Sequence, residues 1–212
     1  TVDLGRVEPI AGAALTTAAG AAGVRWPAEV RILTSDDGRT FRDQCDLVAL
    51  DANRNGPLPE KYAIRHLATD ELRARGRYVM FLMLPLAGSS FTFVDEVEVL
   101  RGPADLLAQE PVGQVVVDVR DYVSRGRRER AVRLRWRSDA EALDALMRRA
   151  PVDEAVRQRL ASRLVELRAQ LDAEAVPSTE DLKAILPIGD AHGRLFALQA
   201  ELWRAAGLAP LW

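Results

Sequence analysis

Hydrophobic and polar positions in the first part of the chain follow the short alternating runs that are typical of β-strands. Runs of strand length, rich in β-branched and aromatic residues, occupy 7–17, 28–35, 62–69, 77–85 and 91–100. Between two of them, Asp37-Gly38 offers the positive φ values that a tight hairpin needs. Residues 51–61 are polar, contain Gly and Pro, and predict a long loop. Strands at this spacing, without helices between them, predict an antiparallel β-sandwich over residues 1–102.

The next segment, 103–138, is predicted to hold connecting strands. Residues 114–119 resemble a strand. Residues 130–137 alternate strictly, with Val132, Leu134 and Trp136 on one face and arginines on the other. These two strands either pair with each other or add to the sandwich.

From residue 139 onward the apolar spacing changes to three and four, which predicts an α-helical region over 139–212. Ser138 and Glu141 have the spacing of a capping box at a helix start. Further helices are predicted at 151–176, 177–186 and 190–207. Their apolar stripes must pack on each other, on the sandwich or on another domain.

Composition and charge narrow the class of protein. The net charge of −2 gives no argument for nucleic acid or a membrane surface as a partner. The single cysteine, Cys45, excludes an intrachain disulfide and a cysteine zinc cluster. The sequence has no apolar run of about 18 residues, so no membrane span is predicted. The chain opens on strand-like residues and ends without a polar tail, so we expect a piece of a longer protein.

Four segments in order give the β region a family resemblance. They are "VDLG" (2–5), "AEVRILTSDDGRTF" (28–41), "ARGRYVMFLM" (74–83) and "VDEVEVLRG" (94–102). Together they resemble the galactose-binding-like superfamily, the discoidin or coagulation-factor type C sandwiches that include many bacterial carbohydrate-binding modules. The resemblance implies a jelly-roll β-sandwich in an extracellular or periplasmic protein. The family has a strand and a loop before its "Asp-Leu-Gly" strand, and this chain starts at that strand. Either the front of the fold is missing from the chain, or another segment, such as the strands at 115–137, replaces it. The helical region matches nothing in the family.

The resemblance also implies where a sugar binds. In the family, sugars bind at one end of the sandwich, and the corresponding loops here are 18–27 and 86–91. Arg25, Trp26 and Phe91 are the residue types that stack on a sugar ring and bind its hydroxyls. The alternatives are that Trp26 closes the sandwich end and that Phe91 belongs to the core. Loop 18–27 has few polar side chains, which argues against a binding pocket rich in hydrogen-bonding groups.

Three carboxylates, Asp95, Glu96 and Glu98, stand close together in the last predicted strand. Strand alternation places Asp95 on the opposite face from Glu96 and Glu98, and a plain strand face offers no cleft for a catalytic carboxyl pair. By the resemblance, Glu96 matches the family's closing-strand glutamate, which helps to hold a structural calcium ion. A solvated strand face is the alternative to this calcium site.

The remaining candidate chemistry is sparse. His66 and His192 lie in different regions, so we expect no metal pair. Residues 120–137 contain eight arginines and two acids, a segment that fits either an acidic polymer or a solvated, salt-bridged surface. The sequence has no phosphate loop, nucleophile elbow or zinc motif.

These observations predict a non-catalytic carbohydrate-binding or accessory module of a larger secreted bacterial glycan-processing protein. Its partners would be a glycan and the other domains of the parent protein, not nucleic acid. The alternative is a structural scaffold or interaction domain that packs against a neighbouring catalytic domain and has no ligand of its own. No constellation of residues supports an enzyme in this chain.

Overall fold

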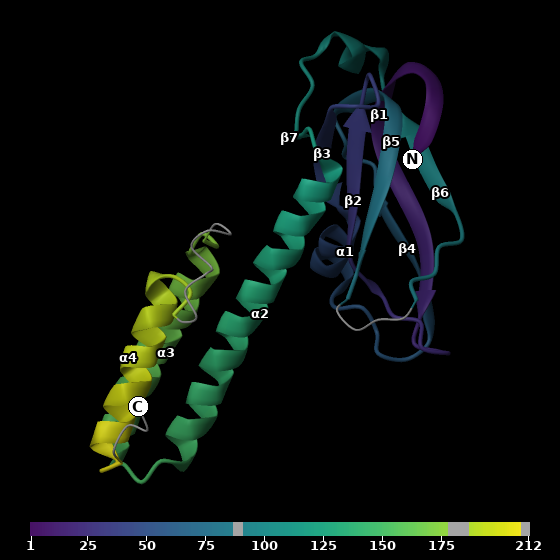
Figure 1. Cartoon of the computed structure of the whole chain (residues 1–212). Helices are drawn as coiled ribbons and strands as arrows, with labels where there is room; N and C mark the ends of the chain where they lie inside the picture. Colours follow the sequence, from purple (N-terminus) through teal and green to yellow (C-terminus); the bar gives the residue numbers. More distant parts are fainter. Residues whose placement is uncertain (87–90, 178–186, 209–212) are drawn as a thin grey trace. The chain divides into compact units, whose positions relative to one another are not determined.

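A computed structural model describes residues 1–86, 91–177 and 187–208 (Figure 1). The chain divides into two compact units, Thr1–Val123 and Ser124–Trp212. The first unit holds the β-sheet, and the second holds most of the helical residues.

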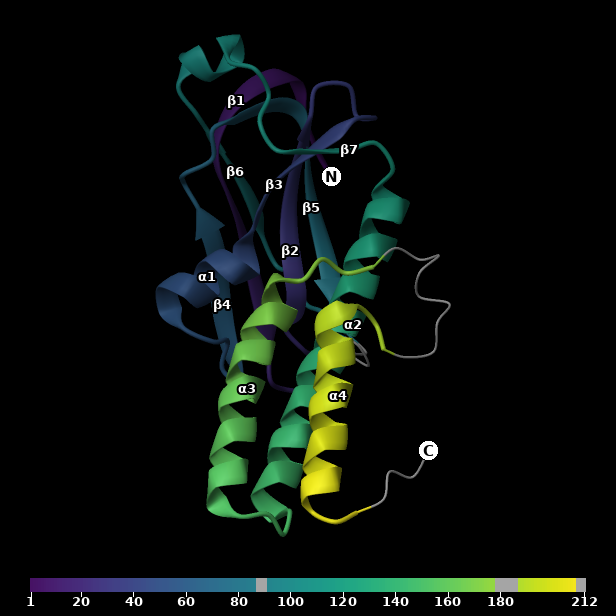
Figure 2. The same ribbon diagram turned by 90° about the vertical axis from the view of Figure 1, so that its left-hand side faces the viewer.

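The first unit is built on one open antiparallel sheet of seven strands. In chain order the strands are β1 (Val2–Ala19), β2 (Pro27–Ser35), β3 (Phe41–Asp46), β4 (Ala63–Thr69), β5 (Ala74–Pro85), β6 (Val97–Arg101) and β7 (Gln114–Val116). Their spatial order is β4-β1-β5-β2-β3-β7, and β6 pairs with β1 outside this path (Figures 1 and 2).

Antiparallel β structure followed by helices is therefore confirmed, but the described residues show neither a sandwich nor a jelly roll. The long strand β1 keeps the sheet continuous because it changes neighbours along its length. Residues 2–10 of β1 pair with β5, and residues 13–19 pair with β4. The pairing of β1 with β6 is irregular between Ile10 and Gly12. Through these pairings, β1 joins β4 and β6 to β5 in a single sheet.

Gly12 is required where β4 and β6 flank β1 together. A Cβ atom at this position would lie 2.3 Å from the carbonyl oxygen of Thr69 and 2.9 Å from the side chain of Leu100. Beneath this region, side chains of β1, β2, β4 and β5 form one buried core, to which Leu15, Val30 and Leu67 contribute. These four strands are consecutive in the strand order, and their side chains form the core on one side of the sheet together with Leu47 of the helix that follows β3.

The hairpin between β2 and β3 is formed as predicted. Gly38 has φ of 72°, and its backbone N–H donates to the hydroxyl of Ser35. The Asp37 carboxylate accepts from the backbone N–H groups of Arg39 and Thr40, which lower the pKa of Asp37 below its usual range.

The prediction of a loop over 51–61 is wrong in its first part, because α1 (Leu47–Asn55) extends into it. Asp46 caps this helix by accepting from the backbone N–H of Val48 at 3.0 Å. Gly56, with φ of 78°, ends the helix. The helix packs against β2, β3 and β4.

The other helical elements are η1 (Ala104–Ala108, 3₁₀), α2 (Val119–Arg149), α3 (Glu154–Ala173) and α4 (Asp190–Ala205). The helices predicted at 151–176 and 190–207 are confirmed as α3 and α4, with Gly207 just after α4 at φ of 68°. The helix predicted at 177–186 lies, except for Pro177, outside the described residues.

The strand predicted at 130–137 is wrong, because these residues lie within α2. Val132, Trp136 and Ala140 are buried at a spacing of four, whereas Leu134 is 64% exposed. The capping box predicted at Ser138 is also wrong. That residue lies in the middle of α2, where backbone N–H groups already have partners within the helix.

In the second unit, α3 and α4 lie beside α2 and share one apolar core (Figure 2). His192 is completely buried in it, and its Nε2 lies 2.9 Å from a carboxylate oxygen of Asp139. Its Nδ1 accepts from the backbone N–H of Ile188, whose carbonyl accepts from Trp136. Both backbone groups of Ile188 are therefore held by buried side chains, which fixes the chain just before α4.

Candidate functional site

A groove of about 400 Å³ lies in the first unit, at the end of the sheet where β1 and β4 reach the loop after β1. Its lining is mainly apolar and aromatic, with two threonines and one carboxylate. The residues are Thr16, Thr17, Ala18, Ala19, Ala21, Ala22, Val24, Tyr62, Ile64, Phe93 and Asp95. The volume lies within the range of small-ligand sites.

The segment just before β6 forms one side of this groove, and β1 holds it in place. The Thr17 hydroxyl donates to the carbonyl of Phe93 at 2.7 Å. The backbone N–H of Asp95 donates to the carbonyl of Thr16 at 3.0 Å, and the Thr16 N–H donates to the carbonyl of Glu96 at 2.9 Å. These bonds extend the contact with β1 beyond the regular pairing of β6, and so position Phe93 and Asp95.

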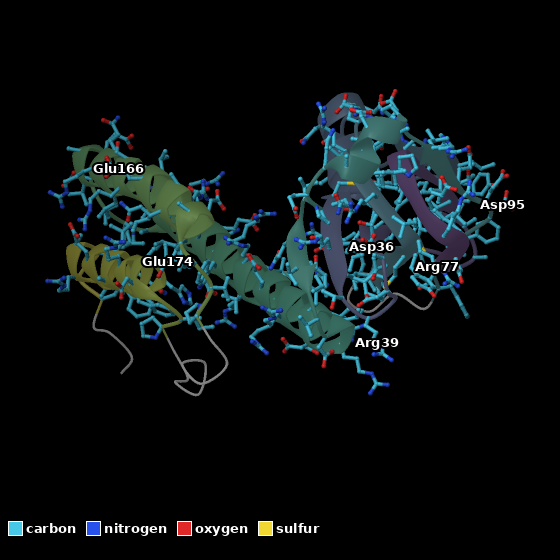
Figure 3. The ribbon with its side chains drawn as sticks, turned by 90° about the horizontal axis from the view of Figure 1, so that it is seen from above. Asp36, Arg39, Arg77, Asp95, Glu166 and Glu174 are labelled. Atoms are coloured by element: carbon cyan, nitrogen blue, oxygen red, sulfur yellow. The ribbon has the colours of Figure 1, made fainter. Side chains whose placement is uncertain are left out.

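Aromatic surface and hydrogen-bonding groups meet in the groove. Tyr62 is 62% exposed and Phe93 is 48% exposed, so part of each ring is open to a ligand. The Thr16 hydroxyl lies 3.1 Å from Nδ1 of His66, an exposed residue of β4. Asp95 lies at the margin of the sheet unit (Figure 3). Its carboxylate can accept hydrogen bonds from hydroxyl groups, and an aromatic ring can cover the apolar face of a ring-shaped ligand.

The three residues predicted to bind sugar lie beside this groove rather than in its lining. The backbone N–H of Arg25 donates to the carbonyl of Phe91 at 3.1 Å, so both predicted loops meet here. Phe91 is 66% exposed and is not part of the core. The half-buried Trp26 donates its indole N–H to the carbonyl of Pro59 at 2.7 Å, as expected of a residue that closes the sheet end.

Tyr62 and Phe93 line the groove but were not among the site residues predicted from the sequence, and Asp95 was considered only as one of three neighbouring carboxylates. One signal could have found Tyr62, because Tyr62, Ile64 and His66 alternate along one strand and so share a face. Large apolar side chains on the same face as a polar residue at a sheet edge indicate an exposed binding surface.

Asp95 lines the groove, and Glu96 does not belong to its lining. Both residues precede β6, so the strand predicted over 91–100 is wrong for residues 91–96. Glu96 is exposed, and its carbonyl already accepts from Thr16. Among the described residues, no three or more His, Cys, Asp or Glu side chains gather as metal ligands. Calcium takes six to eight oxygen ligands, so this donor set does not fit the calcium site predicted at Glu96.

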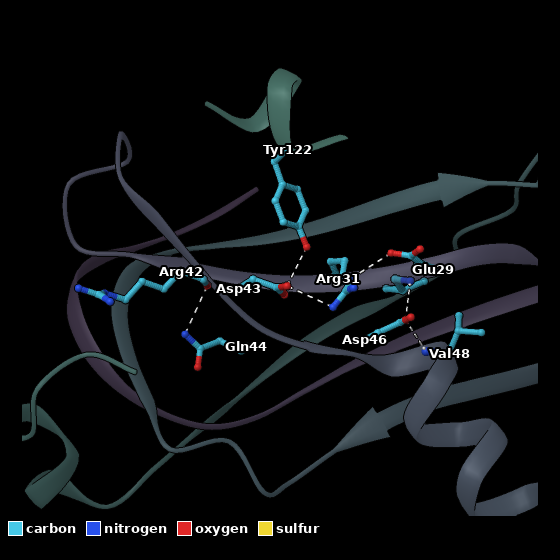
Figure 4. Close-up of polar contacts among 9 residues, drawn as sticks. Glu29, Arg31, Arg42, Asp43, Gln44, Asp46, Val48 and Tyr122 are labelled. Carbon is cyan, nitrogen blue, oxygen red and sulfur yellow. Dashed lines mark hydrogen bonds and ion pairs between the residues drawn. The ribbon is translucent and has the colours of Figure 1, made fainter. Parts of the chain in front are cut away.

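A second group of titratable side chains lies where the first turn of α2 meets the sheet (Figure 4). The Asp43 carboxylate accepts from the Tyr122 hydroxyl at 2.7 Å and from Arg31 at 3.1 Å. Arg31 also donates to Glu29 at 3.0 Å. Burial, together with the bond to Asp43, raises the pKa of Tyr122 above its usual range. Because these groups bind one another, the cluster holds the first turn of α2, which belongs to the first unit, against the sheet.

A pairing irregularity in β3 places Asp43 in this cluster. Ile32 pairs with Cys45 and Leu33 pairs with Asp43, so Gln44 is the extra residue of a bulge. The Gln44 side chain instead donates to the Thr34 hydroxyl and to the carbonyl of Val112.

Comparison with known proteins gives no family. No family model, curated protein or solved structure matches this chain. Within the part of the chain that the structure describes, no helix is long and apolar enough to span a membrane.

Proposed function

We propose that the groove at the end of the sheet binds carbohydrate, and that the chain is a non-catalytic carbohydrate-binding or accessory module of a larger secreted bacterial glycan-processing protein. The observation that carries this proposal is the joint presence of Tyr62, Phe93 and Asp95 in one groove. An exposed ring covers the apolar face of a sugar, and a carboxylate orients its hydroxyl groups.

Two features of the sheet support the galactose-binding-like resemblance behind this proposal. The four segments that carry the resemblance lie in or beside paired strands of one sheet, since β1 pairs with β5 and β6, and β2 pairs with β5. Side chains of β1 and β4 also share one core with those of β2 and β5. We propose on this basis that the sheet is a variant of the jelly-roll sandwich.

The experiment is a glycan array with the full chain and with the variants Tyr62→Ala, Phe93→Ala and Asp95→Asn. Stacking of a nucleic-acid base on an aromatic ring is worth about 1–3 kcal/mol. Taking the same range for a sugar, we expect each aromatic variant to weaken binding by roughly 5- to 100-fold. Asp95→Asn tests the acceptor while it preserves the size of the side chain.

Val117→Ala is the control, because Val117 is 76% exposed and follows β7, at the opposite end of the strand order. Arg25→Ala and Phe91→Ala test whether the neighbouring loops extend the site. The proposal is wrong if no glycan binds, or if Val117→Ala weakens binding as much as Phe93→Ala does.

A second candidate function is an interaction domain that packs against a neighbouring domain of the parent protein. The observation that favours it is the apolar surface in and beside the groove, where Tyr62, Ile64 and Phe91 are each more than 60% exposed. Exposed apolar patches of this kind mark protein interaction sites.

The two functions differ in what covers the groove. In the parent protein, an interaction domain would protect Tyr62, Ile64 and Phe93 from solvent, whereas a glycan-binding module would leave them accessible. Carbene footprinting of the parent protein, compared with this chain alone, measures that difference directly.

A further inference from the structure

Helix α2 contains a stretch, residues 124–131, that lies outside both hydrophobic cores. Tyr122, just before it, packs against a cluster of the sheet unit, and Val132, just after it, is buried in the core of the helical unit. None of these eight residues, all of which the structure describes, is buried. The boundary between the two compact units falls directly before the stretch, after Val123.

The composition and exposure of this stretch make it the part of α2 that opens most readily. A short helical segment without tertiary packing is only marginally stable in water, because most helical stability in proteins comes from a packed apolar face. Gly126 weakens the segment further, since glycine is a poor helix former. The ion pair between Glu129 and Arg133 lies at the surface, where such pairs contribute little to stability. Local opening of residues 124–131 therefore leaves both cores intact.

The same stretch contains one of the two pairs of adjacent arginines in the chain. The pairs are Arg127-Arg128 and Arg148-Arg149, and both lie in α2. Neither Arg127 nor Arg128 makes a hydrogen bond or an ion pair with any described residue. Serine endoproteases that recognise paired basic residues bind the two guanidinium groups in acidic subsites. The first pair can enter such subsites without loss of a side-chain contact.

The second pair of arginines lies where α2 is packed. Met147, the residue before this pair, is 2% exposed and belongs to the core of the helical unit. Arg157 of α3 donates to the carbonyls of Met147 and Ala150, which stand on either side of the pair. An endoprotease cleaves a chain that has opened locally, so cleavage after Arg149 requires these contacts to break. The two pairs are alike in sequence, but the structure leaves only the first one accessible to a protease.

We propose that residues 124–131 are a proteolytic processing site, which a serine endoprotease specific for paired basic residues cleaves between Arg128 and Glu129. The C–N bond between these residues breaks by hydrolysis. The carbonyl carbon of Arg128 takes the hydroxyl group of water, and the nitrogen of Glu129 takes the hydrogen. The cut leaves two fragments that each retain a buried core. This site is separate from the carbohydrate groove and does not depend on it.

The test is limited digestion of the native full chain by a subtilisin-type endoprotease specific for paired basic residues, with the fragments identified by mass spectrometry. Cleavage after Arg128 should be at least about tenfold faster than cleavage after Arg149, because only the second cut exposes a buried core residue. Hydrogen exchange of the cleaved protein should show both cores still protected. The proposal is overturned if the native chain is not cut, if Arg149 is cut first, or if either core loses its protection.

Two variants test whether local opening of the helix controls the cut. Gly126→Ala should slow cleavage after Arg128 about fivefold, since alanine favours the helix by about 1 kcal/mol and proteolysis follows the population of the opened state. A Cβ at this position meets no heavy atom closer than 3.7 Å, so the alanine fits. Ala131→Gly makes the reverse change at an exposed position and should speed cleavage about fivefold.

Ala142→Gly is the matched control for Ala131→Gly. Ala142 is also an exposed alanine of α2, but it stands beside the buried Leu143 in the packed part of the helix. The rate of cleavage after Arg128 should therefore stay unchanged. If Ala142→Gly speeds that cleavage as much as Ala131→Gly does, the cut follows unfolding of the whole unit, and the proposal is overturned.

Discussion

Asp3 of β1 and Arg77 of β5 form an ion pair in which the guanidinium group donates two hydrogen bonds to the carboxylate. Both carboxylate oxygens of Asp3 accept from Arg77 at 2.8 Å, and one also accepts from the backbone N–H of Gly5. The hydrogen bonds from Arg77, followed by the bond from Gly5, lower the pKa of Asp3 to about 2. The ion pair thus links β1 to β5 beside the point where Asp3 pairs with Tyr78.

Replacement of Arg77 by Gln should raise the pKa of Asp3 toward the usual value of an aspartate, since the strongest cause of the shift is removed. A carboxyl whose pKa is lowered by folding stabilises the fold above its unfolded pKa, and that contribution is lost as the pH falls through about 2. Carbon-detected NMR titration of the Asp3 carboxyl in both proteins measures the shift. An Asp3 pKa that stays near 2 in the variant would contradict the assignment.

Cys45 is the one cysteine of the sequence, and its surroundings suppress its reactivity. Burial, and next the nearby carboxylates of Asp43 and Asp46, raise the pKa of the Cys45 thiol to about 12. The reactive thiolate is therefore scarce at ordinary pH.

Alkylation of Cys45 by iodoacetamide at pH 8 should accordingly be at least about tenfold slower in the folded protein than in urea, and mass spectrometry measures both rates. The raised pKa also predicts that stability is greatest below the pKa of the unfolded thiol and declines as the pH rises toward 12. Equal alkylation rates in the folded and unfolded protein would show that the thiol is accessible and unperturbed.

At the scale of elements, α2 shows that a short stretch of sequence, taken alone, can predict a strand where a helix forms. Over 130–137 the apolar residues alternate as in a strand, but the buried residues Val132, Trp136, Ala140 and Leu143 follow the period of a helix. The helical period becomes evident only when the window extends past residue 137, because eight residues cover little more than two helical turns.

Trp136→Ala and Leu134→Ala distinguish the helix from the predicted strand, since a strand would bury both side chains on one face. Trp136 is 1% exposed, and its loss should lower the free energy of unfolding by about 3–5 kcal/mol. Leu134 is 64% exposed, and its replacement by Ala should change the free energy of unfolding by less than about 0.5 kcal/mol. Urea denaturation measures both variants, and similar losses would favour the strand.

At the scale of the whole molecule, each compact unit has a core of its own. The sheet unit encloses the side chains of β1, β2, β4 and β5, and the helical unit encloses those of α2, α3 and α4. No metal ligands gather among the described residues of either unit. Burial of these apolar side chains stabilises each unit.

Chelation tests whether a calcium ion binds at Glu96, as the sequence predicted. The melting temperature should be the same in EDTA and in excess calcium, because the described carboxylates do not converge on a common point. Magnesium serves as the control for a general effect of ionic strength. A rise in melting temperature with calcium but not with magnesium would instead support the calcium site predicted at Glu96.

Four of the five strands predicted in the first hundred residues, and the helices α3 and α4, were predictable from the sequence because their apolar periods are local and long enough to be distinct. The fifth, predicted over 91–100, begins only at Val97. The turn at Asp37-Gly38 was predictable for the same reason, since its chemistry lies within a few residues. Helix α1 escaped prediction because its start depends on the capping contact between Asp46 and Val48, within a stretch whose polar composition suggested a loop.

Only the tertiary structure decided which residues share a site. Tyr62, Phe93 and Asp95 meet because β1 pairs with β4 on one side and holds the residues before β6 on the other. Likewise, whether two sheets or one would form depended on β1 changing its partner strand partway along its length. Local sequence determines which residues form strands, but strand pairing between distant segments determines where their side chains converge, and that pairing is a property of the whole chain.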